Sequence, residues 1–176
     1  MKMKLKPVLY SGLLFSALIL AACREKRPKQ DFSNNICPSV PAIFPEIDTG
    51  VVLIPNAFSP NGDGKNDIWR PVFKNITDLE MKIIDANGTI LFHSNGLHDG
   101  WEFLNGTKAG MTKYLACVRA TSTMGQVMES CTYIYAYYCT PENPPVENNL
   151  LQFGDQLNPN TPGTYLPTKE NFTNCN

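Results

Sequence analysis

The sequence has few of the residues, and none of the short motifs, on which common enzyme sites are built. It contains two histidines, His93 and His98, and no G-x-S-x-G nucleophile turn, H-E-x-x-H helix or phosphate-binding glycine-rich loop. Its six cysteines include no C-x-x-C pair, which leaves zinc binding and thioredoxin-like chemistry without support. We therefore expect a protein that is not an enzyme and has no resident cofactor.

The sequence also lacks an excess of basic charge and any long helical pattern. Its 15 Lys and Arg residues face 16 Asp and Glu residues, so no basic surface for nucleic acid is expected. No segment repeats apolar residues at helical spacing over enough residues to predict a helix in the folded domain. Both absences favour an all-β domain whose partners are not nucleic acids.

The N-terminus reads as a bacterial lipoprotein signal peptide. Three lysines precede an apolar stretch at residues 8–20, which ends in Leu20-Ala21-Ala22-Cys23, a lipobox. The alternative, a transmembrane anchor, needs about 20 apolar residues, and this stretch is shorter. The sequence predicts a signal helix at residues 1–22, with Cys23 as the lipid-modified first residue of the mature protein. The membrane would then be contacted through the lipid.

The rest of the chain divides by composition into three parts. Residues 23–50 are charged and then rich in Asn and Pro, which predicts a tether. Residues 51–138 carry short β-branched and aromatic runs separated by Gly, Asn and Asp, the pattern of an all-β sandwich or barrel. Residues 139–176 form a Pro- and Asn-rich tail that either wraps the domain or stays mobile. Strands are expected at 51–54, 68–73, 79–85, 89–94, 113–121 and 126–138, with Pro71 confining the second to an edge.

Two hairpins can be located in this pattern. Asn87-Gly88 predicts a type I′ turn, because both residues tolerate positive φ. A three-residue loop ending at Gly125 would pair Ser122 with Gln126, and the same register places Cys117 opposite Cys131.

The cysteines after Cys23 are disulfide candidates, because lipoproteins fold where thiols oxidise. The hairpin register favours a Cys117–Cys131 bridge, and the alternative keeps both as small buried residues. Cys37, Cys139 and Cys175 remain with an undetermined pairing, in which Cys139 or Cys175 could bond to Cys37. Five cysteines follow Cys23, an odd number, so one thiol is left free or is paired between chains.

Residues 54–67 read Ile-Pro-Asn-Ala-Phe-Ser-Pro-Asn-Gly-Asp-Gly-Lys-Asn-Asp, and Gly100-Trp101-Glu102 follows later. These residues resemble the gliding motility-associated C-terminal domain (CHU_C), the type B sorting domain of type IX secretion. The resemblance covers residues 51–138. It implies an immunoglobulin- or fibronectin-III-like antiparallel β-sandwich that directs exported proteins to the cell surface and is not itself catalytic.

Two candidate ligand sites lie in this region. Asn61, Asp63 and Asp67 place oxygens at the alternate spacing used for calcium, although Asn66 stands where an EF-hand loop requires Gly. The alternative is a rigid turn in which these side chains accept hydrogen bonds from nearby backbone N–H groups. Trp101 is a candidate sugar-stacking platform, or else a core residue of the sandwich.

The leading functional expectation is a non-enzymatic outer-membrane lipoprotein whose sandwich serves envelope structure, adhesion or gliding- and secretion-associated assembly. This reading is preferred because residues 23–50 are too short to be a cargo domain. The alternatives are a type IX cargo that uses the domain as its sorting signal, and a glycan- or calcium-binding module. An outer-membrane location, facing the periplasm or the cell surface, is expected. The envelope partner, protein or glycan, is not named by the sequence.

Overall fold

The computed structural model describes residues 40–41, 44, 48–103, 110–138 and 150–170. All of them lie in the second of two compact units, Asp31–Asn176. The elements are β1 (Val40–Pro41), β2 (Val51–Ile54), β3 (Ala57–Phe58), β4 (Ile68–Trp69), β5 (Val72–Lys74), β6 (Ile76–Ile84), β7 (Ile90–Ser94), β8 (Trp101–Glu102), β9 (Met111–Ser122), β10 (Val127–Tyr137) and the short 3₁₀ turn η1 (Gly154–Gln156). No helix in these ranges is long and apolar enough to cross a membrane.

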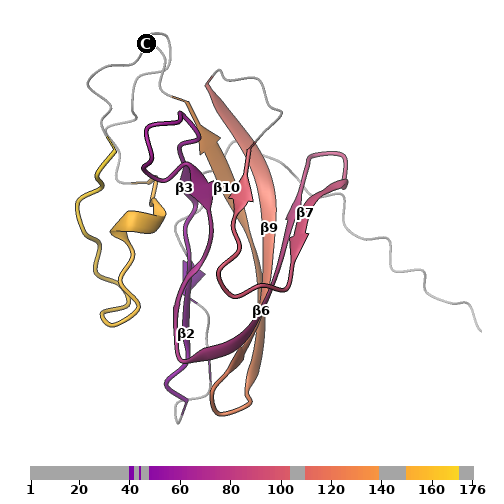
Figure 1. The fold of residues 1–176 in the computed structure, drawn as a ribbon, viewed down its shortest axis with the longest axis vertical. Coiled ribbons are helices and arrows are strands. Elements are labelled where there is room, and N and C mark those ends of the chain that lie inside the picture. The colour runs from indigo at the N-terminus through magenta and orange to yellow at the C-terminus, as the bar shows by residue number, and fades with distance from the viewer. Residues whose placement is uncertain (1–39, 42–43, 45–47, 104–109, 139–149, 171–176) are drawn as a thin grey trace, which may run out of the picture. The chain divides into compact units, whose positions relative to one another are not determined.

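The strands form one large sheet and two small ones (Figure 1). The five-stranded sheet has the order β3-β10-β9-β6-β7, the three-stranded sheet the order β1-β2-β5, and β4 pairs with β8. All pairings are antiparallel except that of β3 with β10. The all-β, predominantly antiparallel architecture predicted from the sequence is confirmed, and it is consistent with a β-sandwich.

The core forms because the central strands alternate apolar and polar residues with a period of two. In β6, Leu79, Met81 and Ile83 are buried, whereas Glu80 and Lys82 between them are only half-buried on the opposite face. The shared core also takes side chains from the smaller sheets, including Val52, Ile54, Trp69 and Trp101. Burial of this apolar surface supplies the main driving force for folding.

The β9–β10 hairpin has the predicted register. The Ser122 amide donates to the Gln126 carbonyl, and Gly125 lies in the left-handed region at φ +79°. Pairing continues to Cys117 opposite Cys131. Ser122 reinforces the turn, since its Oγ accepts bonds from the amides of Met124 and Gln126.

Two local predictions were wrong. The expected strand at 68–73 is broken at Arg70 and Pro71 into β4 and β5, which pair with different strands, β8 and β2. The type I′ turn is also absent, because Gly88 has a positive φ (+85°) and Asn87 does not. Instead, Asp85 closes a longer turn by bonding the amides of Asn87 and Thr89 through its carboxylate.

Candidate functional site

The loop that bears the motif, residues 59–67 (hereafter the motif loop), joins β3 to β4. It closes on itself through a hydrogen bond of 2.8 Å from the Ser59 amide to the Asn66 carbonyl. Gly62 and Gly64 have φ of +86° and +82°, a region that other residues enter only with strain. The glycines at these two positions are therefore required by the path of the backbone.

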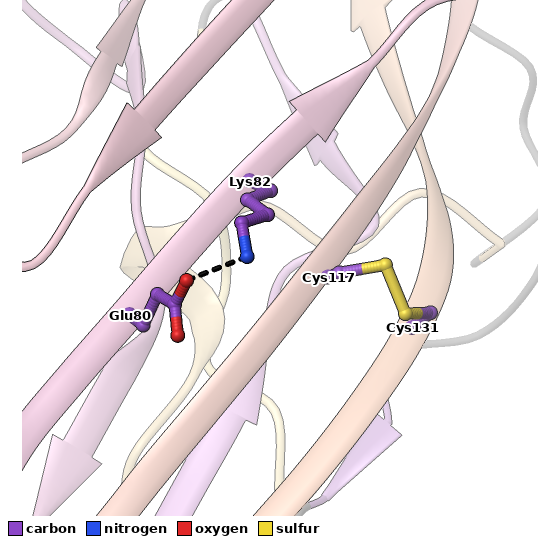
Figure 2. Close-up of a disulfide and its surroundings, with 4 residues drawn as sticks. All are labelled: Glu80, Lys82, Cys117 and Cys131. Carbon is purple, nitrogen blue, oxygen red and sulfur yellow. Dashed lines mark ion pairs between the residues drawn. A yellow bond between two sulfur atoms is a disulfide. The ribbon is translucent and has the colours of Figure 1, made fainter. Parts of the chain in front are cut away.

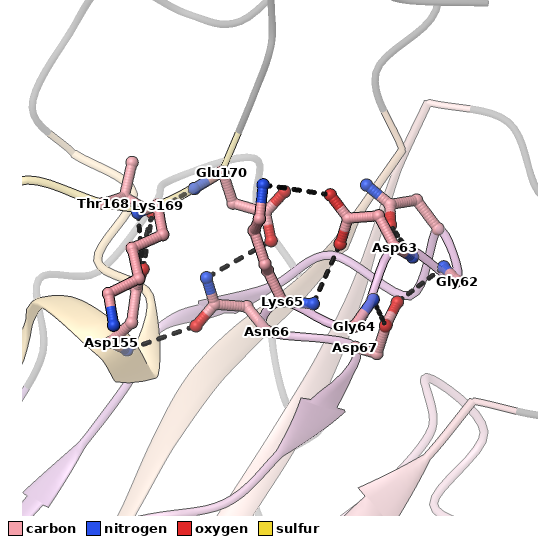
Figure 3. A network of polar contacts seen from close by, with 11 residues as sticks. Gly62, Asp63, Gly64, Lys65, Asn66, Asp67, Asp155, Thr168, Lys169 and Glu170 are labelled. Atoms are coloured by element: carbon pink, nitrogen blue, oxygen red, sulfur yellow. Dashed lines mark hydrogen bonds and ion pairs between the residues drawn. The ribbon is translucent and has the colours of Figure 1, made fainter.

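Three polar side chains of the motif loop, those of Asn61, Asp63 and Asp67, accept hydrogen bonds from the loop's own amides (Asp63 and Asp67 are labelled in Figure 3). The two carboxylate oxygens of Asp67 accept bonds of 2.6 Å each from the amides of Gly62 and Gly64. Asn61 accepts from the Asp63 amide, and Asp63 accepts from the Lys65 amide, each at 2.9 Å. This arrangement is the rigid turn that the sequence offered as an alternative.

The calcium hypothesis gains nothing from this geometry. Oxygens of Asn61, Asp63 and Asp67 accept hydrogen bonds from backbone N–H groups of the loop. Within the described ranges, no group of three or more His, Cys, Asp or Glu residues could hold a metal ion. The spacing of the oxygens reflects the turn, because Asn and Asp side chains bond backbone amides two residues ahead.

A second segment, residues 150–170 (hereafter the strap), is attached to the motif. Its first anchor is Asn56, which is fully buried. The Asn56 side chain donates from Nδ2 to the Leu150 carbonyl at 2.7 Å and accepts the Gln152 amide on Oδ1 at 2.6 Å. The amides of Asn56 and Ala57 both donate to the Gln152 carbonyl. The strap is thus tied to the strand edge by both backbone and side-chain bonds.

Apolar packing supports the same attachment. Phe153 of the strap is 2% exposed and packs in a small cluster with Ala57 and Tyr137, both fully buried. Leu151 packs against this cluster from the strap. Of the two alternatives for the tail, wrapping is therefore the one that holds for residues 150–170.

The second anchor of the strap is Asn66, at the end of the motif loop (Figure 3). Its Oδ1 accepts the Asp155 amide at 3.1 Å, and its Nδ2 donates to Glu170 Oε1 at 3.2 Å. Asp155 in turn accepts bonds from the Thr168 hydroxyl and the Lys169 amide. Asn66 has a positive φ of +46°, a conformation that Asn tolerates better than most residues.

A hollow of about 440 Å³ lies where the motif loop, the adjoining strands and the strap meet, and its lining includes Lys65, Ile68, Arg70, Val72, Asp155 and Lys169. The lining contains basic, acidic and apolar side chains.

Trp101 does not form an exposed platform. It is 6% exposed, and its ring packs at 5.2 Å from Phe58 and 4.9 Å from Tyr114, measured between centroids. A sugar needs an open aromatic face, so the ligand-binding hypothesis for Trp101 was wrong and its core alternative is correct. β8 carries this side chain inward because Trp101 lies opposite the buried Trp69 of β4.

The structure contains a disulfide between Cys117 and Cys131 on the outer face of the five-stranded sheet (Figure 2). Ser122 and Gln126 form a hydrogen-bonded pair, and pairs alternate along the hairpin, so Cys117 and Cys131 occupy a non-hydrogen-bonded position. Opposed residues approach most closely at such positions, which allows the bridge.

Charged residues surround this bridge. Lys82, beside Cys117, forms an ion pair of 2.6 Å with Glu80 (Figure 2). The bond from Lys82, and then that from His93, holds the pKa of the Glu80 carboxyl below its usual value. The pair is solvent-accessible, so it contributes little to stability.

Removing the bridge should destabilise the sandwich. With Cys117→Ala and Cys131→Ala combined, we expect the free energy of unfolding to fall by about 3 kcal/mol, since the bridge closes a loop with a sequence separation of 14. Urea unfolding of the oxidised proteins would measure the change. Equal urea midpoints for the wild type and the double variant would contradict this expectation.

Three observations now define the class of protein: an antiparallel all-β body, a motif loop stiffened by its own Asn and Asp side chains, and no catalytic motif in the sequence. The family model of the CHU_C type IX secretion signal domain matches residues 52–150. The chain belongs to this family, as its motif suggested. Domains of the family are sorting signals without catalytic activity, and a type IX sorting domain implies a secreted or cell-surface protein. No curated protein and no solved structure matches the chain.

Several functional residues escaped sequence reasoning. Asn56 and Glu170 join the motif to the strap, yet they were not singled out, and Asn66 was noted only as a departure from the EF-hand pattern. A sign was available for Asn56, a polar residue in an otherwise apolar run from Ile54 to Phe58. Predictions for Cys23, Cys37, Cys139 and Cys175, and for the signal helix, lie outside the described residues.

Proposed function

We propose that the sandwich is a working type IX sorting signal, which delivers this chain to the outer surface of the cell, where it acts as a non-enzymatic envelope protein. The observation that carries the proposal is the family match over residues 52–150. The match begins within β2, takes in every later strand of the sandwich and reaches the first residue of the strap.

A non-enzymatic role is supported by how Asp85 and Glu80, the two carboxylates whose pKa values are lowered, are used. Asp85 closes a turn, and its bond to the Thr89 amide lowers the pKa of the carboxyl. Glu80 pairs with Lys82 on an open sheet face. Perturbed carboxylates often indicate catalysis, but here hydrogen bonds that serve the fold account for both shifts.

We further propose that the delivered protein is anchored by lipid at Cys23 in the outer membrane. The support is the lipobox, Leu20-Ala21-Ala22-Cys23, after a basic and apolar leader. Mass spectrometry of the mature N-terminus would test this step, with Cys23→Ala as the control variant. An unacylated wild-type N-terminus would exclude the anchor without affecting the sorting proposal.

A secretion assay tests the sorting role. Residues 48–176 would be fused behind a signal peptide and a fluorescent reporter in a type IX-competent strain and in the same strain with its translocon disabled. We expect the reporter at the surface or in the medium of the competent strain and in the periplasm of the disabled one, because sorting requires the translocon.

The matched control replaces the sandwich with an unrelated β-sandwich of similar size, which should leave the reporter in the periplasm of both strains. If the reporter fused to residues 48–176 also stays in the periplasm of the competent strain, the sorting role is excluded. The chain would then remain a member of the family that does not use its domain for export.

A further inference from the structure

Glu170 is buried at the far end of the strap with half of its carboxylate unsatisfied. Its side chain is 9% exposed. One oxygen, Oε1, accepts a bond of 3.2 Å from Asn66 Nδ2, and the other, Oε2, has no hydrogen-bond partner. A charged carboxylate with a single neutral donor is unfavourable away from water, whereas a neutral carboxyl group is tolerated there.

The charges around Glu170 add to this disadvantage. Asp63 and Asp67 of the motif loop and Asp155 of η1 all act on it as like charges. Lys65 approaches Asp63 at 3.9 Å, and no lysine or arginine in the described part of the chain forms an ion pair with Glu170.

From this geometry we propose that Glu170 is a proton-controlled latch, which holds residues 155–170 of the strap against the motif loop when neutral and releases them when ionised. The first attachment, at Asn56 and Phe153, contains no group that titrates between pH 4.5 and pH 8, because burial raises the pKa of its tyrosine, Tyr137, above the ordinary value of 10. This attachment therefore stays closed. Opening would therefore be confined to the part of the strap that borders the hollow through Asp155 and Lys169.

The direction of the effect follows from the pKa of the two states. Burial, followed by the like charges, raises the pKa of Glu170 to about 7 when the strap is docked, against an ordinary value of 4.5. For a raised pKa, the docked state has its full stability below pH 4.5 and loses it as pH rises toward 7. Above pH 7 the stability lost by the docked state no longer changes with pH.

Release of Glu170 would spread to its neighbours. The Glu170 amide donates to the Thr168 hydroxyl, and that hydroxyl donates to the Asp155 carboxylate. The Lys169 amide also bonds Asp155. These bonds make the last three residues of the strap and η1 one connected group, so they should open together.

Hydrogen exchange on the full chain tests the latch. After correction for the intrinsic pH dependence of exchange, we expect the opening constant of the Lys169 and Glu170 amides to rise roughly ten- to a hundredfold between pH 4.5 and pH 8, since each pKa unit is a factor of about ten. The Gln152 amide, held by Asn56, should show no such rise.

Glu170→Gln is the decisive variant, because a glutamine can still accept the bond from Asn66 and never carries charge. We expect opening in this variant to be independent of pH, while Glu129→Gln, at an exposed site on β10, should retain the wild-type response. A wild type without pH dependence, or a Glu170→Gln variant that keeps it, would overturn the proposal.

Discussion

Replacing Trp69 with alanine should lower the free energy of unfolding by roughly 3–5 kcal/mol, the range for truncating a large buried aromatic side chain. Trp69 is fully buried and is among the largest such side chains in the described core. It lies opposite Trp101 across the β4–β8 pair, so its loss leaves a cavity between the small sheet and the large one. Urea unfolding monitored by circular dichroism would measure the change.

Two further variants test this expectation: one keeps an aromatic ring at Trp69, and the other is a control at an exposed position. Trp69→Phe keeps an aromatic ring but removes the bond of 3.0 Å from Nε1 to the Pro55 carbonyl, and we expect it to cost about 1–3 kcal/mol. Tyr165→Ala, at a side chain that is 48% exposed on the strap, should change stability by less than about 0.5 kcal/mol. A Trp69→Ala effect as small as that of Tyr165→Ala would show that the core is not organised around this residue.

Asn56→Ala should loosen the beginning of the strap and lower the free energy of unfolding by roughly 2–4 kcal/mol, because it removes two buried hydrogen bonds at once. The Leu150 carbonyl would lose the donor Nδ2, and the Gln152 amide would lose the acceptor Oδ1. The backbone bonds to Gln152 remain, so a loosened strap is expected rather than loss of the sandwich. Limited proteolysis, with cleavage sites identified by mass spectrometry, would locate the change to residues 150–170.

Asn95→Ala is the matched control, because Asn95 is an asparagine exposed on the surface after β7. We expect wild-type stability and wild-type cleavage for this variant. If Asn56→Ala behaves in the same way, the strap is held by backbone bonds and by Phe153, and the Asn56 side chain contributes nothing measurable.

The strap changes where the folded unit ends. The sequence placed the boundary of the sandwich after residue 138, and the family match reaches residue 150. The next twenty residues, 151–170, contact the motif again. They form hydrogen bonds with Asn56 and Asn66, and Phe153 packs against the core. A sorting signal cut at residue 150 would leave Asn56 and Asn66 without these partners, and for this reason the secretion assay retains the strap.

The large sheet could be predicted from sequence because its signals are local. Alternation in residues 79–84 sets one face of β6 toward the core, and the left-handed Gly125 fixes the β9–β10 register over its whole length. Because that register alone places Cys117 opposite Cys131, the bridge could be predicted without knowledge of the other strands. β2 was likewise predicted with its observed limits.

The short strands β1, β3 and β8 could not be predicted, since each spans two residues and carries no periodic pattern, and β4 was predicted only as part of a longer strand. They exist because partners distant in the chain pair with them, as Tyr135 does with Ala57. The turn after β6 was misjudged for a similar reason, because the Asp85 carboxylate, and not the tolerance of Asn87 for positive φ, determines its shape.

The sequence alone determined the all-β class, the family motif, the main hairpin and its disulfide, since each of these depends on residues close together in the chain. Only the tertiary structure showed that Asn56 and Asn66 bind the strap, that Trp101 is buried, and that Glu170 lies among three aspartates. Those facts depend on segments separated by up to 104 residues, the distance in sequence from Asn66 to Glu170. The burial and electrostatic environment of these side chains are fixed only when such distant segments come into contact.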